Sequence, residues 1–367
     1  MRVVRIRLFQ YRNLRDQDIV PREEGITLFS GLNGHGKTNI LEAIYFLAYG
    51  RSFRTSSANE CTRYGESCCR IEGLIERGSL NRDISVLISG TEKKMFLMGK
   101  PAPLNEFVGN LHLLAFAREH LNVVRGGPTD RRAFLDRAMV SIYPGHIDGL
   151  ATYSRALKQR NSVLSDIRDG KISYEARLMD AWDEALVRAG TLVLSNRLKY
   201  IESMKRELPR GLFGSEEFKI HYFSSLGMDD INISVLEKNF REKLLKLREK
   251  DRHYGHTSVG PHRDDLKLFV NGKSLIDFGS SGQQRSGLLS LYFSQMEIHF
   301  KTHGFYPVFL VDDAEAELDE ARLRIFLGYL SSRTQTLITS TRNFLINSVP
   351  DDVLHFEVRD GEVSKKG

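Results

Sequence analysis

The sequence predicts an α/β fold in which a helical insert interrupts a mixed sheet. The first sixty residues follow the pattern strand, strand, helix, and a glycine-rich turn joins the second strand, residues 25–30, to a helix that begins at about Lys37. The apolar spacing turns helical between residues 115 and 210, and short strands return near residue 265. Because 367 residues exceed what one ordinary core accommodates, we expect two domains.

Composition and charge point to a globular protein without a membrane-spanning segment. Hydrophobic residues make up 41% and charged residues 27%, which is typical of soluble domains. The most apolar stretch near the N-terminus, residues 40–49, is too short to cross a bilayer. The first seven residues alternate like a strand rather than a signal peptide, and three cysteines fit a reducing compartment, so we expect a cytoplasmic, nucleoid-associated protein without a membrane partner. The net charge of +6 permits a nucleic-acid or anionic-membrane partner but requires neither.

Apolar periodicity and turn signals place the other elements. Val3–Phe9 is expected to be a strand, and residues 69–98 are expected to be antiparallel because residues 83–89 alternate between polar and apolar. The pair 271–272, Asn-Gly, follows an expected strand at 266–270 and predicts a hairpin. The elements expected after it are a helix at 286–300, a strand at 308–311, a helix at 320–330, a strand at 336–339 and a hairpin around 360–361.

The helical insert divides the chain into three expected segments. No heptad pattern persists in the insert, which excludes a long coiled coil. Residues 1–115 are expected to form the first part of the α/β domain, including an antiparallel β subdomain. Residues 116–245 are expected to form a helical arm domain, and residues 246–367 the second part of the α/β domain.

A phosphate-binding loop is the strongest functional signal in the sequence. Residues 31–38 fit the pattern G-x-x-x-x-G-K-[ST], with a strand before them and an amphipathic helix after them. Glycines let backbone N–H groups turn toward an anion, Lys37 would reach the β- and γ-phosphates, and Thr38 would bind Mg²⁺. The alternative is a glycine-rich turn that binds nothing, and the strand–loop–helix context argues against it. The residues expected to contact ATP here are Ser30, Gly31, Leu32, Asn33, Gly34, His35, Gly36, Lys37, Thr38 and Asn39.

The acidic end of an apolar strand is the second candidate feature. Residues 308–311 are apolar and run into Asp312 and Asp313, as in a buried parallel strand that ends at a site. Asp312 would hold Mg²⁺, through water, and Asp313 stands where a catalytic base or water-orienting carboxylate is needed. A strand followed by an acidic turn is the alternative, and the phosphate loop makes it the weaker one. We therefore expect Lys37, Asp312 and Asp313 to carry ATP hydrolysis.

The segment Ser280-Ser281-Gly282-Gln283 begins an expected helix and resembles the signature of ABC ATPases. In that superfamily the signature contacts the γ-phosphate from the opposite subunit. A hydroxyl, glycine N–H groups and a helix N-terminus suit an anion, whereas an ordinary serine helix cap is the alternative. The order phosphate loop, signature, acidic strand is specific to ABC and SMC ATPases. The expected fold is therefore a P-loop NTPase head of the ABC/SMC kind, with two chains enclosing two ATP molecules.

Positions after the acidic strand help to separate rival functions. Asp319 lies where the superfamily has its D-loop aspartate, and Thr339 and Thr341 end the next strand at the switch position. Nucleotide-binding subunits of ABC transporters usually have a histidine there, so these threonines argue against a transport role. A structural SMC-like head would carry long coiled coils. An ATPase-linked nuclease would need an appended metal-dependent domain, whereas the chain ends soon after the last core strand.

Four further stretches resemble the RecF family of bacterial recombination mediators. The resemblance covers essentially the whole chain and departs from the family pattern at Ser281, at residues 118–120 and at Ala316. These departures bear on dimer affinity and hydrolysis rate, whereas the triphosphate contacts are retained. The four stretches are residues 50–55 (GRSFRT), 129–136 (TDRRAFLD), 153–161 (YSRALKQRN) and 260–266 (GPHRDDL).

The resemblance implies an ATP-dependent DNA-binding clamp with a short helical arm. Such proteins dimerise with ATP, bind duplex DNA at gaps or single-strand–duplex junctions, and work with RecR and RecO to load recombinase. ATP hydrolysis would be weak and would reset the clamp, since Asp313 is one methylene shorter than the superfamily's usual glutamate. Arginines are the expected DNA contacts, with a solvated charge or an internal ion pair as the alternative for each. These arginines are Arg51, Arg54, Arg131, Arg132 and Arg137.

Overall fold

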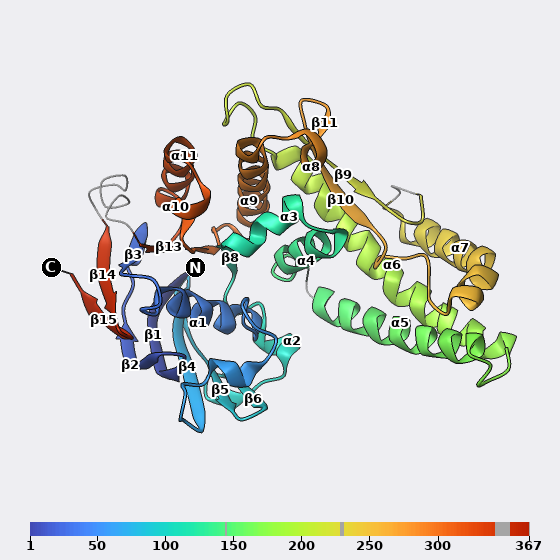
Figure 1. Ribbon diagram of the computed structural model, residues 1–367, viewed down its shortest axis with the longest axis horizontal. Coiled ribbons are helices and arrows are strands. Elements are labelled where there is room, and N and C mark those ends of the chain that lie inside the picture. The colour runs from blue at the N-terminus through green and yellow to red at the C-terminus, as the bar shows by residue number, and fades with distance from the viewer. Residues whose placement is uncertain (144, 228–230, 342–352, 367) are drawn as a thin grey trace. The chain divides into compact units, whose positions relative to one another are not determined.

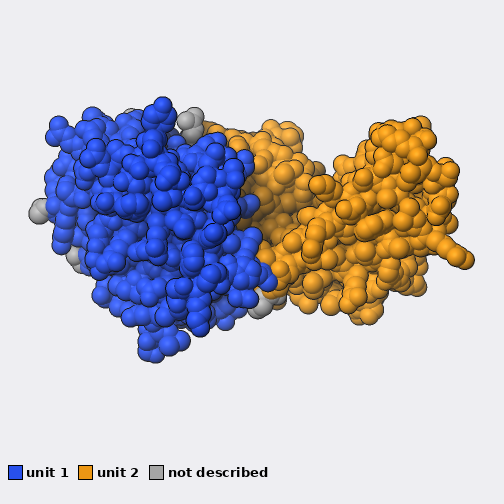
Figure 2. All heavy atoms as spheres, turned by 90° about the horizontal axis from the view of Figure 1, so that it is seen from below, with its two compact units in different colours: residues 1–121, 296–367 blue, residues 122–295 orange. Residues whose placement is uncertain are grey.

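The computed structural model describes residues 1–143, 145–227, 231–341 and 353–366 (Figure 1). The chain divides into two compact units (Figure 2). The first is formed by residues 1–121 and 296–367, and the second by residues 122–295. Among the described residues, no helix combines the length and the apolar character that a bilayer crossing requires.

The first unit contains an antiparallel sheet with the strand order β2-β1-β4-β5-β6-β7. Alternate residues of β4 are buried between Cys69 and Ile75, as expected for a sheet with one face on the core. The pairing of β4 with β5 and of β5 with β6 confirms the antiparallel arrangement expected for residues 69–98. The strands are β1 (Arg2–Tyr11), β2 (Leu14–Ile19), β4 (Cys68–Arg77), β5 (Leu80–Ser89), β6 (Glu92–Leu97) and β7 (Lys100–Pro101).

A mixed sheet with the order β15-β14-β3-β13-β12-β8 is the second sheet of this unit. The strands from β14 to β8 run parallel, and β15 pairs antiparallel at one edge. Both β8 and β12 are buried along their whole length, which explains their unbroken apolar sequences. The strands are β3 (Ile26–Ser30), β8 (Leu113–Phe116), β12 (Val308–Val311), β13 (Thr336–Ser340), β14 (Leu354–Arg359) and β15 (Glu362–Lys365).

Helix α1 (Lys37–Tyr49) contacts both sheets of the first unit. Ten of its 13 residues are buried, and it ends at Gly50, whose left-handed conformation caps the helix. A helix held on so many sides has little freedom to shift, so α1 fixes the position of the loop that precedes it. The shorter helical elements of this unit are η1 (Ala58–Cys61), α2 (Leu104–Phe107), η2 (Arg118–Leu121), α10 (Ala314–Glu317) and α11 (Glu320–Ser331).

The second unit is mostly helical. Its three long helices, α5 (His146–Arg168), α6 (Ala176–Glu207) and α7 (Ile233–Tyr254), contact one another. Helix α9 (Ser281–His303) begins in this unit and ends in the first. Its described residues also form a small antiparallel sheet of order β11-β10-β9 and three short helices. These elements are α3 (Asn122–Arg125), α4 (Pro128–Met139), β9 (Phe218–Phe223), β10 (Asp265–Val270), β11 (Lys273–Ser274) and α8 (Leu275–Phe278).

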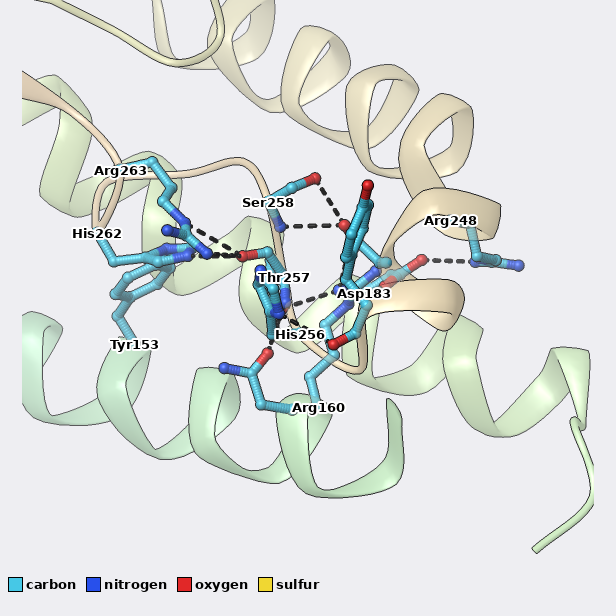
Figure 3. A network of polar contacts seen from close by, with 12 residues as sticks. Tyr153, Arg160, Asp183, Arg248, His256, Thr257, Ser258, His262 and Arg263 are labelled. Atoms are coloured by element: carbon cyan, nitrogen blue, oxygen red, sulfur yellow. Dashed lines mark hydrogen bonds and ion pairs between the residues drawn. The ribbon is translucent and has the colours of Figure 1, made fainter. Parts of the chain in front are cut away.

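One arginine organises the buried polar interior of the second unit (Figure 3). The Arg160 side chain is fully buried, and it donates to Asp183 Oδ1 and Asp251 Oδ2, each at 2.7 Å. It also donates to Thr257 Oγ1 at 2.8 Å, while Arg248 donates to the other oxygen of Asp183 at 2.5 Å. Since buried charges must be paired, Arg160 ties α5 to α6 and α7.

An ion pair between the buried Arg197 and the partly buried Asp136 brings two of the family-like stretches together. Arg197 donates to both carboxylate oxygens of Asp136, at 2.9 and 2.8 Å. The same guanidinium group donates to Pro261 O at 2.7 Å. Asp136 ends the stretch at 129–136 and Pro261 lies in the stretch at 260–266, so both stretches help to build the interior of the second unit.

The structure confirms most of the expected elements. The expected strand at 308–311 coincides with β12, and the expected tail hairpin is β14 with β15. The structure adds β2, β9 and α7, which the sequence analysis did not predict. The boundaries of the two compact units differ from the expected segment boundaries at 115/116 and 245/246. Residues 246–295, for example, belong to the mostly helical unit. The division into head and arm segments stays a prediction.

Candidate nucleotide-binding site

The loop between β3 and α1 is shaped by close backbone contacts. A Cβ atom on Gly31 would lie 2.2 Å from Val358 O, and one on Gly36 would lie 2.7 Å from Asn13 Oδ1. Gly36 also has a φ of 112°, which side chains disfavour. Gly31 and Gly36 are therefore required by this geometry whether or not an anion is bound.

The C-terminal hairpin also holds this loop. The backbone N–H of Gly361 donates to His35 O at 3.1 Å. A Cβ atom on Gly361 would lie 2.3 Å from Asn13 O, and Asn13 in turn donates to Gly34 O at 3.2 Å. The loop is thus supported by the turn after β1 and by the turn between β14 and β15.

Lys37, the first residue of α1, folds back into the loop. Its ammonium group donates to Gly31 O at 2.9 Å and to Leu32 O at 3.0 Å, and the residue is only 4% exposed. Burial lowers the pKa of Lys37, and the carboxylates of Asp313 and Asp312 partly oppose this shift. A phosphate group in the loop would offer this cation a stronger acceptor than the two carbonyl oxygens.

Two hydroxyl groups converge on Asp312 at the end of β12. Thr38 donates to Asp312 Oδ1 at 2.9 Å, and Thr339 donates to the same oxygen at 2.7 Å. Burial raises the pKa of Asp312, and these two hydrogen bonds oppose the increase. The structure therefore brings together Thr38, Asp312 and Thr339 from three separate segments, whereas the sequence analysis assigned Thr38 and Asp312 to Mg²⁺ and Thr339 to the switch position.

Asp313 has an unusual backbone and an exceptional side-chain environment. Its φ is 44°, and its N–H donates to Thr339 Oγ1 at 3.0 Å. Burial, followed by the charge of Asp312, raises the pKa of Asp313 to about 6. Its Oδ1 atom is buried and has no hydrogen-bond partner among the described residues. Such an oxygen is suited to accept a hydrogen bond from a bound water or substrate.

Glu315 is a carboxylate of this region that the sequence analysis missed. Its Oε1 atom accepts from Ser340 Oγ at 2.7 Å and from the Thr341 N–H at 2.8 Å. It also accepts from Thr341 Oγ1 at 3.5 Å. Glu315 thereby holds the end of β13 and the residue after it, where the expected switch residues Thr339 and Thr341 lie.

A cavity of about 460 Å³ opens beside the loop. Asn39 lines it, and Arg54 donates to Asn39 Oδ1 at 2.7 Å. Arg12 also lines the cavity and donates to both oxygens of the fully buried Glu42, at 3.0 and 2.7 Å. Burial alone would lower the pKa of Arg12, but the hydrogen bonds and charge of Glu42 raise it. The lining residues that the sequence analysis did not name are Arg12, Asn13, Glu60, Thr62 and Tyr64.

The candidate signature lies in the second unit and caps helix α9. Ser280 Oγ accepts from the Gln283 N–H at 3.2 Å, and Gln283 Oε1 accepts from the Ser280 N–H at 2.9 Å. This reciprocal pair is a capping box, and Ser280 and Ser281 are both exposed. Gly282 follows in the first turn of α9. Ser280 therefore forms the helix cap that the sequence analysis gave as the alternative. Contact of this segment with a triphosphate stays a prediction.

Asp319 and the candidate arginines lie in different environments. Asp319 caps α11 by accepting from the Arg322 N–H at 3.0 Å. Arg131 is buried and donates to both oxygens of Asp265, at 2.6 and 3.0 Å. For this arginine, the alternative of an internal ion pair applies. Arg132 donates to Asp264 O at 2.8 Å. Arg51 and Arg54 are exposed, and Arg137 is partly exposed.

The oxygen atoms at the end of β12 fit a Mg²⁺ ion. Thr38 Oγ1 and a carboxylate oxygen of Asp312 lie 2.9 Å apart, beside a cavity that Thr38 and Asp313 line. Mg²⁺ prefers hard oxygen ligands and keeps several waters, so it needs only one or two protein groups together with substrate phosphates. Thr38 and Asp312 would hold the ion, which would neutralise phosphate charge.

Comparison with known proteins places this chain in a family. The family model for the RecF/RecN/SMC N-terminal domain matches residues 2–365. The DNA replication and repair protein RecF of Halalkalibacterium halodurans is 33% identical over 374 residues, covering 100% of both chains. A solved structure of the recombination mediator protein RecF-ATPrS in the RecFOR pathway has a TM-score of 0.91 and 30% identity, covering 100% of this chain and 98% of that one. Another, of RecF-ATP, has a TM-score of 0.87 and 30% identity, covering 100% and 99%. The chain belongs to the RecF family of DNA replication and repair proteins, within the RecF/RecN/SMC group of ATPases.

Proposed function

We propose that this protein is an ATP-dependent DNA-binding clamp that dimerises on ATP and acts in recombinational repair. The observation that carries the proposal is the convergence of Thr38 and Thr339 on Asp312 beside a loop that encloses Lys37. That arrangement supplies a cation for phosphates and oxygen ligands for Mg²⁺ at one place. The structures of relatives with ATP and ATPrS support ATP as the nucleotide.

ATP binding would rearrange contacts that already exist in the loop. The Lys37 ammonium group would exchange the carbonyls of Gly31 and Leu32 for phosphate oxygens. Thr38 and Asp312 would hold Mg²⁺ in place of their mutual hydrogen bond, with Asp312 acting through water. The other parts of the nucleotide would lie in the cavity beside the loop, which Asn13 and Arg54 line.

Hydrolysis would depend on Asp313. Its buried Oδ1, which no described residue contacts by a hydrogen bond, can orient the attacking water, and its pKa of about 6 leaves it mostly ionised at neutral pH. The side chain is one methylene shorter than a glutamate, which increases its distance from the water and favours slow turnover. Slow turnover suits a switch, because loss of the γ-phosphate would release the dimer.

The dimer would form when the signature of each chain covers the γ-phosphate of the other. Ser280 and Ser281 are exposed at the N-terminus of α9, where hydroxyl and N–H groups favour an anion. The D-loop residue Asp319 would lie at the same interface. Duplex DNA and single-strand–duplex junctions are the proposed nucleic-acid ligands, with RecR, RecO and recombinase as partners in the pathway that the relatives' structures name. Arg51, Arg54, Arg132 and Arg137 are the arginines that remain candidates for DNA phosphates.

Mass in solution and duplex-DNA binding, measured with ATP, with ADP and without nucleotide, test this proposal. The salt concentration must be fixed, because phosphate contacts are salt-sensitive. A doubled mass and DNA binding that both require ATP are the expected results. Ser281→Arg should keep ATP binding and lose the doubled mass, whereas Ser215→Arg, also exposed in the second unit, should behave like the unmodified protein. A monomer that ignores DNA in all three states would remove the clamp and leave the ATP site.

A further inference from the structure

Three histidines gather in the first unit, away from the residues that line the nucleotide cavity. His112 precedes strand β8, and His299 and His303 lie one turn apart on α9, where side chains share a face. Each offers a ring nitrogen, and the three nitrogens lie within 4.8 Å of one another. Phe305 packs against all three rings, with centroid distances between 5.2 and 5.6 Å.

Backbone carbonyl groups fix the protonation of two of these rings. His112 Nε2 lies 3.0 Å from Gly109 O, and His299 Nδ1 lies 2.8 Å from Phe305 O. A carbonyl oxygen can only accept, so each of these nitrogens carries the proton of its ring. The remaining nitrogens, His112 Nδ1 and His299 Nε2, then both present lone pairs, although they lie only 2.6 Å apart.

Two lone pairs at this distance repel each other unless a cation lies between them. A proton shared by His112 and His299 is one solution, but it engages only two of the three imidazoles whose nitrogens gather here. A metal ion uses all three rings, and metal-binding histidines characteristically donate their other N–H to a backbone carbonyl.

We propose that His112, His299 and His303 bind a divalent transition-metal ion of the Zn²⁺ class. Neutral imidazole nitrogens suit Zn²⁺, and three such ligands leave a fourth position for water. Ligand nitrogens around tetrahedral Zn²⁺ lie about 3.3 Å apart, so the rings of His112 and His299 separate by roughly 0.7 Å when the ion enters. The charges of Arg77 and the N-terminal amine lie close enough to act on His299, and they limit the affinity.

The bound metal has a structural role beside the mixed sheet. His112 O accepts from the Val308 N–H at 3.0 Å. This hydrogen bond joins the residue before β8 to the first residue of strand β12. His299 and His303 lie in the last turns of α9. The ion therefore fastens the end of α9 to the edge of the sheet whose strand β12 leads to Asp312.

Direct metal analysis of the full-length protein tests this site. Protein stripped with a chelator is dialysed against Zn²⁺ alone, and bound metal is measured by mass spectrometry together with the midpoint of thermal unfolding. One Zn²⁺ per chain and a higher midpoint are expected. His303→Gln should weaken binding at least tenfold, whereas the control His256→Gln, an exposed histidine of the second unit, should leave it unchanged.

The visible absorption of Co²⁺, added to the unmodified protein, provides a test that needs no variant. Intense bands of a tetrahedral nitrogen-ligated site are expected, and Zn²⁺ should remove them by competition. Absence of bound Zn²⁺ at micromolar free metal, or binding that His303→Gln leaves intact, would overturn the proposal. Since ATP binding does not use these histidines, it should be the same with and without Zn²⁺, which separates this outcome from a failure of the proposed function.

Discussion

Thr38 donates its side-chain hydrogen bond to Asp312 Oδ1 at 2.9 Å, across 274 positions of sequence. The contact exists because the parallel strands β3, β13 and β12 are neighbours in one sheet and their carboxyl ends meet at the same edge. Thr339, at the end of the middle strand β13, donates to the same oxygen. The geometry of this edge gives the first two predictions.

Asp312→Asn should weaken Mg²⁺-dependent nucleotide binding by at least tenfold while leaving stability nearly unchanged. An amide oxygen still accepts from Thr38 and Thr339, but it lacks the charge that Mg²⁺ requires. Titration with a fluorescent ATP analogue, with and without Mg²⁺, measures the effect. Asp277→Asn, an exposed aspartate of the second unit, is the matched control. Equal Mg²⁺ dependence in both variants would contradict the assignment of Asp312.

Asp313→Asn should bind ATP and dimerise but lose turnover by roughly 100-fold, the scale of a lost general base. Asparagine tolerates the positive φ of 44°, so the backbone should not rearrange. Phosphate release under saturating ATP measures the loss. Asp313→Glu should retain activity, because it keeps the carboxylate and extends it by one methylene. Normal turnover in Asp313→Asn would show that the water is positioned by another group.

Asp136→Asn should destabilise the protein by about 3 kcal/mol at pH 7, because it leaves the buried Arg197 without a carboxylate. Burial alone would raise the pKa of Asp136, but the hydrogen bond from His146 and the charge of Arg197 lower it below its ordinary 3.8. A carboxyl group with a lowered folded pKa stabilises the fold above the unfolded value and loses this effect as pH falls through the folded value. Urea unfolding should therefore show a constant difference in the free energy of unfolding between the unmodified protein and Asp136→Asn from about pH 8 to pH 5. This difference should shrink only below about pH 4.

Arg131→Ala and Arg51→Ala should separate internal ion pairing from DNA contact. Arg131 is buried against Asp265, so its loss should cost about 3 kcal/mol of stability. Arg51 is exposed, so its loss should leave stability unchanged, weaken duplex binding and lower the slope of affinity against salt by about one. Thermal unfolding and binding at several salt concentrations measure both effects. An unaltered salt slope in Arg51→Ala would remove that residue from the DNA surface.

The sequence predicted the parts of the site that depend on local pattern. The phosphate loop and strand 308–311 each have a signature that spans only a few consecutive residues, and the structure has helix α1 after the loop and strand β12 at 308–311. Helix α7 was missed because it buries only Leu236, Phe240, Leu244 and Asp251, a narrow stripe in a highly charged segment. Arg12, Asn13 and Glu315 carry no local signal, because only the tertiary fold brings them to the cavity or to β13.

The family-like stretches show a second limit of sequence reasoning. Residues 153–161 and 260–266 are polar and charged, which is a common mark of a binding surface. In the structure, Arg160 is fully buried and Pro261 O accepts from the buried Arg197. Sequence alone does not distinguish a polar group that meets a ligand from one that is paired in the interior, since both need the same residue types.

The contact of Val358 and Gly361 with the phosphate loop has a consequence for how the protein matures during synthesis. The loop is translated within the first forty residues, but its support is translated more than three hundred residues later. A nascent chain that has not yet released residues 354–365 from the ribosome lacks the strand against which Gly31 packs. A chain without residues 354–365 therefore contains the phosphate-loop sequence but lacks the backbone groups that support it.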